Sequence, residues 1–304
     1  MNLKLYLRGG LGNQLYQYSV ARYFQKKFHF EKLEILTNEY KNYKIRNLEI
    51  DNFELSDTAI IDDKLNIQDS LIKSAYHLFQ FIYHNLRKRN APQLSFTIGN
   101  TQYVCGMIRI CSFGVRKNKD LFLYSYLVSA DIASKMRDQL MNEIKLKGKR
   151  TEGYLSYLSD IQANKSIAVS IRCAKDYSDN GWPICSRDFY CNGINKIENR
   201  IGKCNIYIFA DDINKVINEG WFNYYHDRSI YVNGLDVCES FELLRHCDNY
   251  VCSNSSFSWW GAFLSYGANP IIYSPDRVFG NTSSDDDVLT KYKGVEYLNY
   301  KTGQ

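Results

Sequence analysis

The chain has 304 residues, of which 45% are hydrophobic and 23% charged, and it contains only 4 Pro and 18 Gly. This length and composition allow one large domain or two smaller ones with ordinary cores, and they argue against long disordered linkers. The formal net charge of +5 suits anionic small molecules or an acidic membrane surface, but the excess is too small to indicate a nucleic-acid partner. The 9 Cys form no CxxC pair, so we expect reduced, packed thiols rather than disulfides or zinc ligands.

The first half of the chain begins with a predicted strand, a glycine-rich turn and a helix. Residues 3–7 form the strand and residues 9–14 the turn, after which apolar side chains recur at helical spacing. Because the strand begins almost at once and no apolar run is long enough to span a membrane, we expect a cytoplasmic protein without a targeting segment.

The glycine-rich turn does not match the common nucleotide-binding loops. No Lys-Ser or Lys-Thr follows it, as one would in a P-loop, and the third Gly of GxGxxG is missing. The turn either lets the helix pack closely or forms part of a ligand site. The adjacent amides of Asn13 and Gln14 favour a site.

A second helix is predicted over residues 71–86. Its apolar residues recur at steps of 4, 3, 4 and 4: Leu71, Ala75, Leu78, Ile82 and Leu86. The basic residues 87–89 that follow suit the dipole at the carboxyl end of a helix, although a basic end on an aromatic-rich helix could also lie on a membrane. We favour a buried stripe, because such stripes usually face the core.

The stretch 147–153 is the best linker candidate, and we place a domain boundary there, with one domain over residues 1–150 and another over 151–304. After it, strands predicted at 166–171, 205–210, 250–252 and 270–273 alternate with helices, which indicates a parallel sheet. In such sheets ligands bind beyond the carboxyl ends of the strands. Polar groups follow three of these strands, and we expect them to converge on one rim: Arg172, Asp211 with Asp212, and Ser253 to Ser256.

Residues 253–264 set four Ser and an Asn against a group of aromatic side chains. They connect a predicted buried strand to a helix start, where outward N–H groups and the helix dipole favour phosphate. The Ser and Asn side chains can also cap the helix. We expect Trp259 and Trp260 to pack and fix the turn rather than bind a sugar. A buried helix start without a ligand is the alternative.

Arg172 ends a predicted buried strand, where its charge needs an anionic partner. That partner is either the carboxylate of Asp176 or Asp211, in an ion pair, or a phosphate. The two N–H groups of the guanidinium fork match a phosphate in two-point contact. Asp211 and Asp212 resemble a metal-binding pair. Two adjacent Asp at a strand end are as often a helix cap and a structural partner, so we expect no metal.

Together these motifs resemble glycosyltransferase family 11, the α-1,2-fucosyltransferases. The family's Gly-Gly-Leu-Gly-Asn-Gln signature is present at residues 9–14, and its Ser-Asn-Ser-Ser-Phe-Ser-Trp-Trp-Gly-Ala signature is present unchanged at 253–262. The strand end at 209–212 is similar to the family's Phe-Ser-Asp-Asp.

The middle signature of the family, His-x-Arg-Arg-Gly-Asp-Tyr, is altered. Arg172 matches its first Arg, and Asp176 and Tyr177 match its end after a one-residue insertion. Ser170 replaces the His and Cys173 replaces the second Arg, so no role of those two residues can be transferred. The variation suggests a divergent branch, such as bacterial enzymes that decorate surface polysaccharide.

The resemblance implies a GT-B-like α/β fold of two Rossmann-like domains with parallel sheets. GDP-fucose would be held mainly by residues 151–304 and the acceptor mainly by residues 1–150. It also implies inverting transfer without a metal or other cofactor. Arg172 would contact the β-phosphate, Asn13 would close from the other domain, and Asp176 is a candidate base beside Asp211 and Asp212. We expect the remaining donor contacts from Gly10, Gly12, Gln14, Asp211, Asp212, Asn254, Ser255, Ser256 and Phe257.

The activity so implied is transfer of L-fucose from GDP-β-L-fucose to O2 of a galactose, in O-antigen lipopolysaccharide or other surface-glycan synthesis. The acceptor would be a galactose-terminated glycan and could be lipid-linked, which would bring a peripheral enzyme to the inner face of the plasma membrane. Two alternatives stay open: a related enzyme using another sugar nucleotide, and a non-catalytic nucleotide- or glycan-binding homologue.

Overall fold

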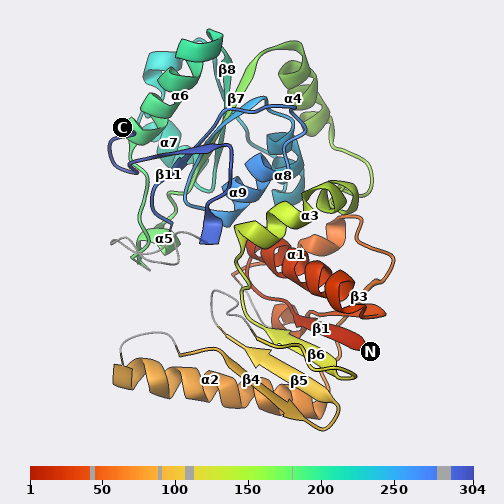
Figure 1. Ribbon diagram of the computed structural model, residues 1–304. Coiled ribbons are helices and arrows are strands. Elements are labelled where there is room, and N and C mark those ends of the chain that lie inside the picture. Colours follow the sequence, from red (N-terminus) through yellow and green to blue (C-terminus); the bar gives the residue numbers. More distant parts are fainter. Residues whose placement is uncertain (42–44, 88–90, 107–112, 180, 279–288) are drawn as a thin grey trace. The chain divides into compact units, whose positions relative to one another are not determined.

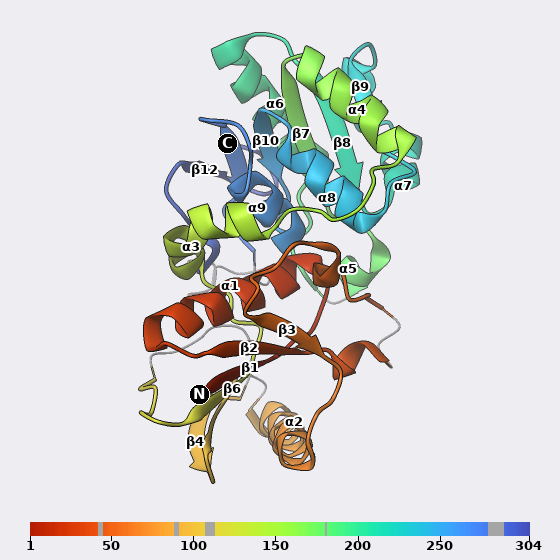
Figure 2. The same cartoon turned by 90° about the vertical axis from the view of Figure 1, so that its right-hand side faces the viewer.

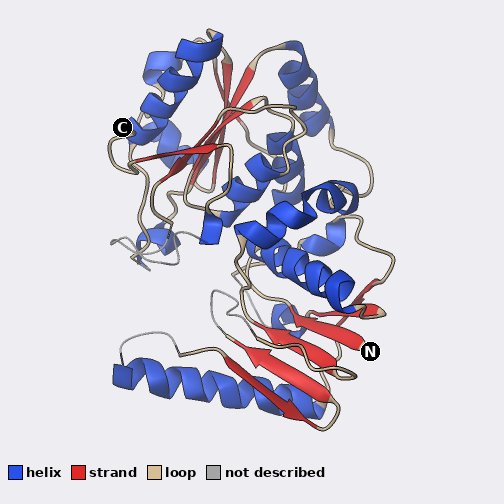
Figure 3. Ribbon diagram, viewed as in Figure 1, coloured by secondary structure: helices blue, strands red, loops and turns tan. Residues whose placement is uncertain are grey.

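The computed structural model describes residues 1–41, 45–87, 91–106, 113–179, 181–278 and 289–304, except for the side chains of Asp176 and Ser178 (Figure 1). The chain falls into two compact units, unit 1 over Met1–Lys145 and unit 2 over Leu146–Gln304. Within the described residues each unit has its own six-stranded sheet. Figure 3 shows both sheets in red with helices beside them.

The sheet of unit 1 has the strand order β3-β2-β1-β6-β5-β4 and is parallel except for the antiparallel pair β4 and β5. Figures 1 and 2 show α1 and α3 on one face of this sheet and α2 on the other. The strands are β1 (Asn2–Tyr6), β2 (Lys32–Leu36), β3 (Ala59–Asp62), β4 (Leu94–Ile98), β5 (Thr101–Cys105) and β6 (Asp120–Tyr124). The helices are α1 (Leu11–Phe28), α2 (Ile67–Arg87) and α3 (Ala130–Glu143), with 3-10 turns η1 (Asn38–Lys41) and η2 (Ile50–Asn52).

Helix α2 is present where the spacing of apolar residues predicts it, but the prediction that its stripe is buried is wrong. Leu71, Leu78 and Leu86 are 65%, 60% and 76% exposed. The apolar side chain that α2 buries against the sheet is Tyr76, which packs in a cluster with Tyr124 and other aromatic side chains. The helix carries two apolar faces, and the sheet takes the one that places an aromatic ring against its own aromatic residues.

The sheet of unit 2 has the order β12-β11-β10-β7-β8-β9 and is parallel throughout. One core cluster lies between the sheet and α6, and a second lies between the sheet and α4 with α8, so helices cover both faces. The strands are β7 (Ser166–Ile171), β8 (Asn205–Ala210), β9 (Ser229–Tyr231), β10 (Asn249–Cys252), β11 (Ile272–Pro275) and β12 (Val295–Leu298). The helices are α4 (Glu152–Ala163), α5 (Lys175–Asp179), α6 (Arg187–Ile201), α7 (Ile213–Asn218), α8 (Val237–Arg245) and α9 (Ser256–Phe263), with the 3-10 turn η3 (Asn223–Tyr225).

The parallel sheet predicted for the second half of the chain is therefore confirmed. β7 and β8 have the predicted bounds, whereas β10 begins one residue earlier and β11 two residues later than predicted. The two edge strands, β9 and β12, are not predicted from the sequence. Both are short and only partly buried, so they lack the continuous apolar run that marks a central parallel strand.

Candidate functional site

The candidate site lies in unit 2, at the carboxyl ends of β10, β7 and β8, which are neighbours in the sheet. In the register of these strands Cys252 lies opposite Ser170, and Ile171 lies opposite Ala210. The residues that follow each strand therefore start at the same level, and the predicted convergence of polar groups on one rim is confirmed. Ligands of open α/β sheets bind at such strand ends.

Arg172 forms an ion pair with Asp211, the first residue after β8. The guanidinium carbon also lies 5.0 Å from the centroid of the Tyr177 ring. The side chains of Arg172 and Asp211 keep 16% and 19% of their surface exposed, so a ligand at the rim can reach them. Of the two ion pairs that the sequence leaves open, the structure shows the one with Asp211, and the side chain of Asp176 lies outside the described residues.

Asp211 also holds the backbone that follows β7. Its Oδ1 accepts hydrogen bonds from the N–H of Cys173 at 2.8 Å and of Ala174 at 3.2 Å. This carboxylate therefore fixes both the loop and the guanidinium, and an Arg fixed in this way pays little ordering entropy on binding an anion.

Asp212 has a different task from its neighbour. Its Oδ1 caps α7 by accepting the N–H of Lys215 at 3.0 Å. The two carboxylates thus act as a structural partner and a helix cap, which are the roles that the sequence leaves open beside metal binding. Among the described residues no group of three or more His, Cys, Asp or Glu is arranged to hold a metal ion.

The turn after β10 has the geometry expected of a helix start. Ser255 is the N-cap of α9, and its Oγ accepts the N–H of Phe257 at 3.3 Å. Asn254 is buried, donates through Nδ2 to the carbonyl of Pro183, and has an Oδ1 without a hydrogen-bond partner among the described residues. Ser256 begins the helix and is half-buried. Amide and hydroxyl groups of this turn can therefore contribute to binding an anion.

Tyr177 connects the turn to Arg172. Its hydroxyl donates to the backbone oxygen of Asn254 at 2.8 Å, and its ring lies parallel to that of Trp182, with 6.0 Å between the centroids. Sequence reasoning assigns this residue no role, although its place at the end of the family signature is a signal that could have found it.

The aromatic residues of α9 pack in the interior of unit 2 and hold the turn in place. Trp260 is fully buried, and Trp259 is nearly so and donates its Nε1–H to the carbonyl of Thr290 at 2.6 Å. The Trp259 ring also stacks on Phe263 at 4.6 Å between centroids. Phe257 is half-buried and packs edge-to-face on Phe241 of α8. The prediction that both Trp residues pack rather than bind a sugar fits this arrangement.

Ser170 stands where the family has His, and it forms part of a buried hydroxyl cluster. Its Oγ lies 2.6 Å from the Oγ of Ser258, which lies 2.8 Å from the Oγ of Ser253. The cluster links the end of β7 to α9. No feature of the sequence predicts the part played by Ser258.

Cys173 stands where the family has its second Arg, and its thiol is buried. Burial, with a contribution from Asp211, raises the pKa of this thiol to about 12. The thiol is therefore neutral at physiological pH and cannot supply the positive charge of an Arg.

The third carboxylate of this region, Asp176, lies in the short helix α5, which begins three residues after Arg172. Its side chain lies outside the described residues. Its predicted role as a base stays a prediction.

In unit 1 the glycine-rich turn connects β1 to α1, with Gly10 at the N-cap. Gly9 has φ +78°, and a Cβ there would lie 2.8 Å from Nδ2 of Asn13. A Cβ on Gly10 would lie 3.1 Å from Cδ of Arg46. These two glycines thus allow a close approach, and Gly12, in the first turn of α1, is buried.

Gln14 is fully buried, and its amide is occupied by backbone groups. Oε1 accepts the N–H groups of Glu49 and Ile50, and Nε2 donates to the carbonyls of Gly9 and Asn47. Because an amide can make four hydrogen bonds in all, a contact between Gln14 and a ligand would replace one of these. Asn13 is half-buried at the start of α1. The ligand roles predicted for both residues stay predictions.

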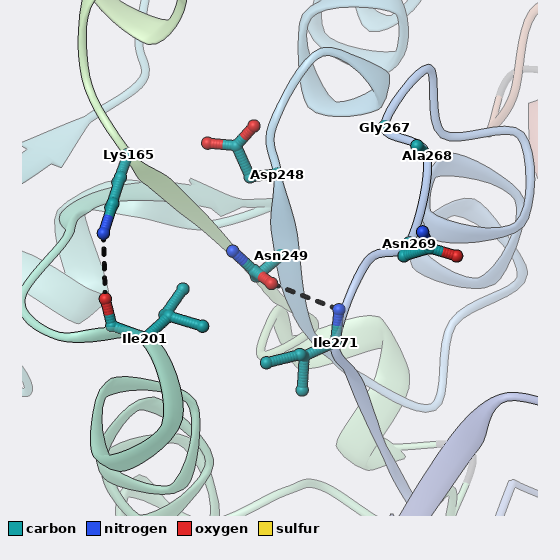
Figure 4. Close-up of a pocket in the computed structure, with 8 residues that line it drawn as sticks. All are labelled: Lys165, Ile201, Asp248, Asn249, Gly267, Ala268, Asn269 and Ile271. Atoms are coloured by element: carbon teal, nitrogen blue, oxygen red, sulfur yellow. Dashed lines mark hydrogen bonds between the residues drawn. The ribbon is translucent and has the colours of Figure 1, made fainter.

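A separate hollow of about 390 Å³ opens at the other end of the strands of unit 2, where β7, β10 and β11 begin (Figure 4). Its polar groups bind neighbouring backbone: Lys165 donates to the carbonyl of Ile201 at the end of α6, and the side-chain oxygen of Asn249 accepts the N–H of Ile271. Asn249 is the first residue of β10, so the hollow lies about 13 Å from the rim, one strand of four residues away. It carries none of the predicted site residues.

The chain has two Rossmann-like α/β units, one of which has an ion-paired Arg and a capped helix start at its strand ends. This architecture is typical of glycosyltransferases of the GT-B-like class. The chain belongs to glycosyl transferase family 11, whose family model matches residues 2–292. The predicted family membership is confirmed.

Two curated relatives come from Escherichia coli. The O-antigen biosynthesis glycosyltransferase WbnK is 26% identical over 309 residues, covering 91% of this chain and 95% of that protein. An alpha-1,2-colitosyltransferase is 27% identical over 276 residues, covering 85% of this chain and 86% of that protein.

Solved structures of fucosyltransferases share the fold. The fucosyltransferase NodZ from Bradyrhizobium matches with a TM-score of 0.53 at 11% identity, over 87% of this chain and 93% of that chain. POFUT1 in complex with GDP matches with a TM-score of 0.50 at 12% identity, over 90% and 97%. At these identities the likeness concerns the fold alone, and it confirms the predicted GT-B-like architecture.

Proposed function

We propose that the chain is an inverting galactoside α-1,2-fucosyltransferase that takes L-fucose from GDP-β-L-fucose. The observation that carries this proposal is Arg172, held by Asp211 and the Tyr177 ring at the strand ends of a family 11 chain. The relative WbnK, an O-antigen biosynthesis glycosyltransferase, supports a role in bacterial O-antigen or other surface-glycan synthesis.

In the proposed transfer, the main task of the protein is to stabilise the leaving group, GDP. The bond between fucose C1 and the β-phosphate oxygen breaks while the acceptor O2 bonds to the opposite face of C1, so a β-linked donor gives an α-linked product. Negative charge then grows on GDP. Arg172, Ser255 and Ser256 are the groups that we assign to it, and fixed donors aimed at developing charge are worth roughly 3 kcal/mol each.

The proton of the acceptor hydroxyl needs a destination. Asp211 is occupied by Arg172 and the loop after β7, and Asp212 caps α7. We therefore retain Asp176 as the candidate base. We also assign the acceptor, a galactose-terminated glycan, to unit 1 together with Asn13. If that acceptor is lipid-linked, the enzyme works in the cytoplasm as a peripheral protein at the inner face of the plasma membrane.

Transfer is proposed to need no metal. Full activity in EDTA is the expected result, because protein cations and amides would carry the charge that a metal would otherwise neutralise. If EDTA abolishes activity and Mn²⁺ or Mg²⁺ restores it, the result would favour the alternative in which Asp211 and Asp212 are metal ligands.

The experiment that tests the function is product analysis with the purified full chain, GDP-fucose and a panel of galactosides. The expected product carries fucose in α linkage on O2 of galactose, identified by NMR. Transfer to another position, or β-linked fucose, would refute the proposal. Binding of GDP-fucose without turnover on any acceptor would favour a non-catalytic homologue.

A second candidate is transfer of a different sugar, favoured by the relative named alpha-1,2-colitosyltransferase and by the altered signature around Cys173. Thermal shifts with GDP-fucose, nucleotide-activated colitose, GDP-mannose and UDP-galactose separate these donors. A ligand at about 100 times its Kd stabilises the fold by roughly 2.7 kcal/mol. A larger shift with a donor other than GDP-fucose would reassign the sugar.

A further inference from the structure

The outward face of α2 in unit 1 carries large apolar side chains from its first turn to its last, with Ser74 and Asn85 among them. Six large side chains of this face are between 47% and 81% exposed: Ile67, Leu71, Leu78, Phe81, Ile82 and Leu86. In Figure 1 the helix runs along the sheet face opposite α1. Single exposed apolar residues are ordinary, but six large ones on one face of a helix mark a contact surface.

The core does not explain this row, because α2 packs on the sheet through a different face. Tyr76 is buried against the sheet, with Ile72 and Phe79 partly buried beside it. At a rise of about 1.5 Å per residue, the outward row from Ile67 to Leu86 is about 29 Å long. Within the described residues every helix is too short or too polar to cross a bilayer, so contact with lipid would be along the helix, parallel to the surface.

The charge around α2 selects the kind of surface that it fits. Residues 64–89 include five Lys or Arg and one acid, Asp69. One of the basic residues, Lys73, faces the sheet and donates to the Tyr6 hydroxyl at 3.1 Å, so the other four are the ones available to headgroups. Asp69 is buried, pairs with Lys4 at 2.9 Å and accepts the Tyr103 hydroxyl at 2.7 Å. No acidic side chain of α2 therefore faces outward, and the segment ends in the exposed Arg87 followed in sequence by Lys88 and Arg89.

We propose that α2 is a membrane-contact helix that lies in the interface of a bilayer rich in anionic lipid. The apolar row would enter the level of the first acyl carbons, and the basic residues would meet headgroup phosphates. A second copy of the chain fits less well, since it would bring two basic helices together. The proposal deepens the peripheral membrane contact proposed above by naming its surface and its lipid, and its test does not depend on transfer activity.

Flotation of the full chain with vesicles tests this proposal. We expect the protein to float with phosphatidylcholine vesicles that contain phosphatidylglycerol, to float less with phosphatidylcholine alone, and to be released as salt is raised. The double variant Leu78→Gln with Phe81→Gln should lower the partition constant about tenfold or more, since two large apolar side chains no longer enter the interface. Leu155→Gln on α4, where Leu155 is 51% exposed, is the matched control and should float like the wild type.

Three outcomes would overturn the proposal. In the first, the wild type floats with neither kind of vesicle. In the second, the double variant floats like the wild type. In the third, neither protein binds vesicles, and sedimentation velocity shows a dimer for the wild type and a monomer for the double variant. If the double variant does not fold, Arg87→Gln replaces it, with loss of the preference for anionic vesicles as the expected result. Turnover on a soluble galactoside, measured in the same preparations, shows whether the proposed function fails separately.

Discussion

Arg172 is the residue on which the proposed chemistry depends most. Its ion pair with Asp211 and its contact with Tyr177 fix the guanidinium at the rim, where charge on GDP would develop. We predict that Arg172→Ala lowers kcat at least about a hundredfold and leaves the protein folded, as measured by steady-state kinetics and circular dichroism. Arg172→Lys should recover little of the loss, because an ammonium lacks the planar fork.

A matched control for this substitution lies elsewhere in unit 2. Arg228 also pairs with a carboxylate, that of Glu198, and both side chains are largely buried. Arg228→Ala should lower the melting temperature with kcat nearly unchanged, because Arg228 precedes β9 and lies at the other end of the strands. Near-normal kcat in a well-folded Arg172→Ala variant would refute the role proposed for Arg172.

The sequence predicts that Arg172 has a partner, but it cannot select the partner. Six apolar or small residues precede it, and all of them are buried in β7, so a charge at that end needs a counter-charge. Asp176 is near in sequence, whereas Asp211 becomes a neighbour only because β7 and β8 pair with Ile171 opposite Ala210. For the same reason the Ser170, Ser258 and Ser253 cluster could not be predicted.

At the scale of elements, local sequence patterns predict the strands of unit 2 better than they predict how α2 packs in unit 1. A fully buried parallel strand shows as a continuous apolar run, and β7 and β8 are found where such runs lie. For α2, periodicity predicts the helix but does not show which of its two apolar faces meets the sheet. That choice depends on Tyr76 fitting beside Tyr124, a contact between residues far apart in the chain.

The packing of α9 against α8 depends on Gly261. A Cβ at this position would lie 2.0 Å from Cδ2 of Leu244, which is fully buried, so Gly261→Ala must shift either the Leu244 side chain or one of the helices. We predict a loss of roughly 1–3 kcal/mol in the free energy of unfolding, measured with urea. Gly153→Ala on α4 is the control: its Cβ would meet Leu235 at an ordinary 3.7 Å, and it should be neutral or stabilise by up to about 1 kcal/mol. Equal effects of the two substitutions would contradict the close helix contact.

The contact between α1 and α3 in unit 1 includes a largely buried ion pair. Arg22 lies 2.7 Å from Glu143, which also accepts hydrogen bonds from Tyr18 and Gln139. Burial alone would raise the pKa of Glu143, but these hydrogen bonds outweigh it and the pKa lies below its ordinary value.

Because the pKa of Glu143 is lower in the folded protein, the free energy of unfolding should depend on pH. The unfolded chain takes up the Glu143 proton at a higher pH than the folded one, so the stabilisation is complete above about pH 4.3 and is lost as the pH falls through the lower folded-state pKa. We predict that Glu143→Gln lowers the free energy of unfolding at pH 7 by about 2–3 kcal/mol and that its difference from the wild type shrinks below about pH 4.3.

Urea titrations between pH 3 and pH 7 measure this difference. Asp131→Asn on α3 removes an exposed ion pair with Lys135 and should change stability by about 0.5 kcal/mol or less. A difference for Glu143→Gln that stays constant across this pH range would show that the carboxylate charge contributes nothing.

At the scale of the whole molecule, each unit has its own sheet and core, and the assignment of donor to unit 2 and acceptor to unit 1 rests on different evidence for each. In unit 2 an Arg lies at the end of β7, and a buried Asn and a capped helix start lie at the end of the neighbouring strand β10. In unit 1 the glycine-rich turn is accounted for by close packing and by the four hydrogen bonds of Gln14. The physical case for nucleotide binding is therefore stronger in unit 2.

Hydrogen exchange with GDP tests this division directly. Amides in loops at strand ends open easily, and a ligand bound to them slows their exchange. We predict that saturating GDP slows exchange in segments 172–179, 211–216 and 253–258, and leaves α2 unchanged as an internal control. GDP-fucose with a galactoside should then add protection in unit 1, including residues 9–14, because we assign the acceptor to that unit. Protection by GDP confined to unit 1 would reverse the two assignments, and with them the role of Arg172, since a nucleotide held by unit 1 alone would leave the rim of β7, β8 and β10 without its proposed ligand.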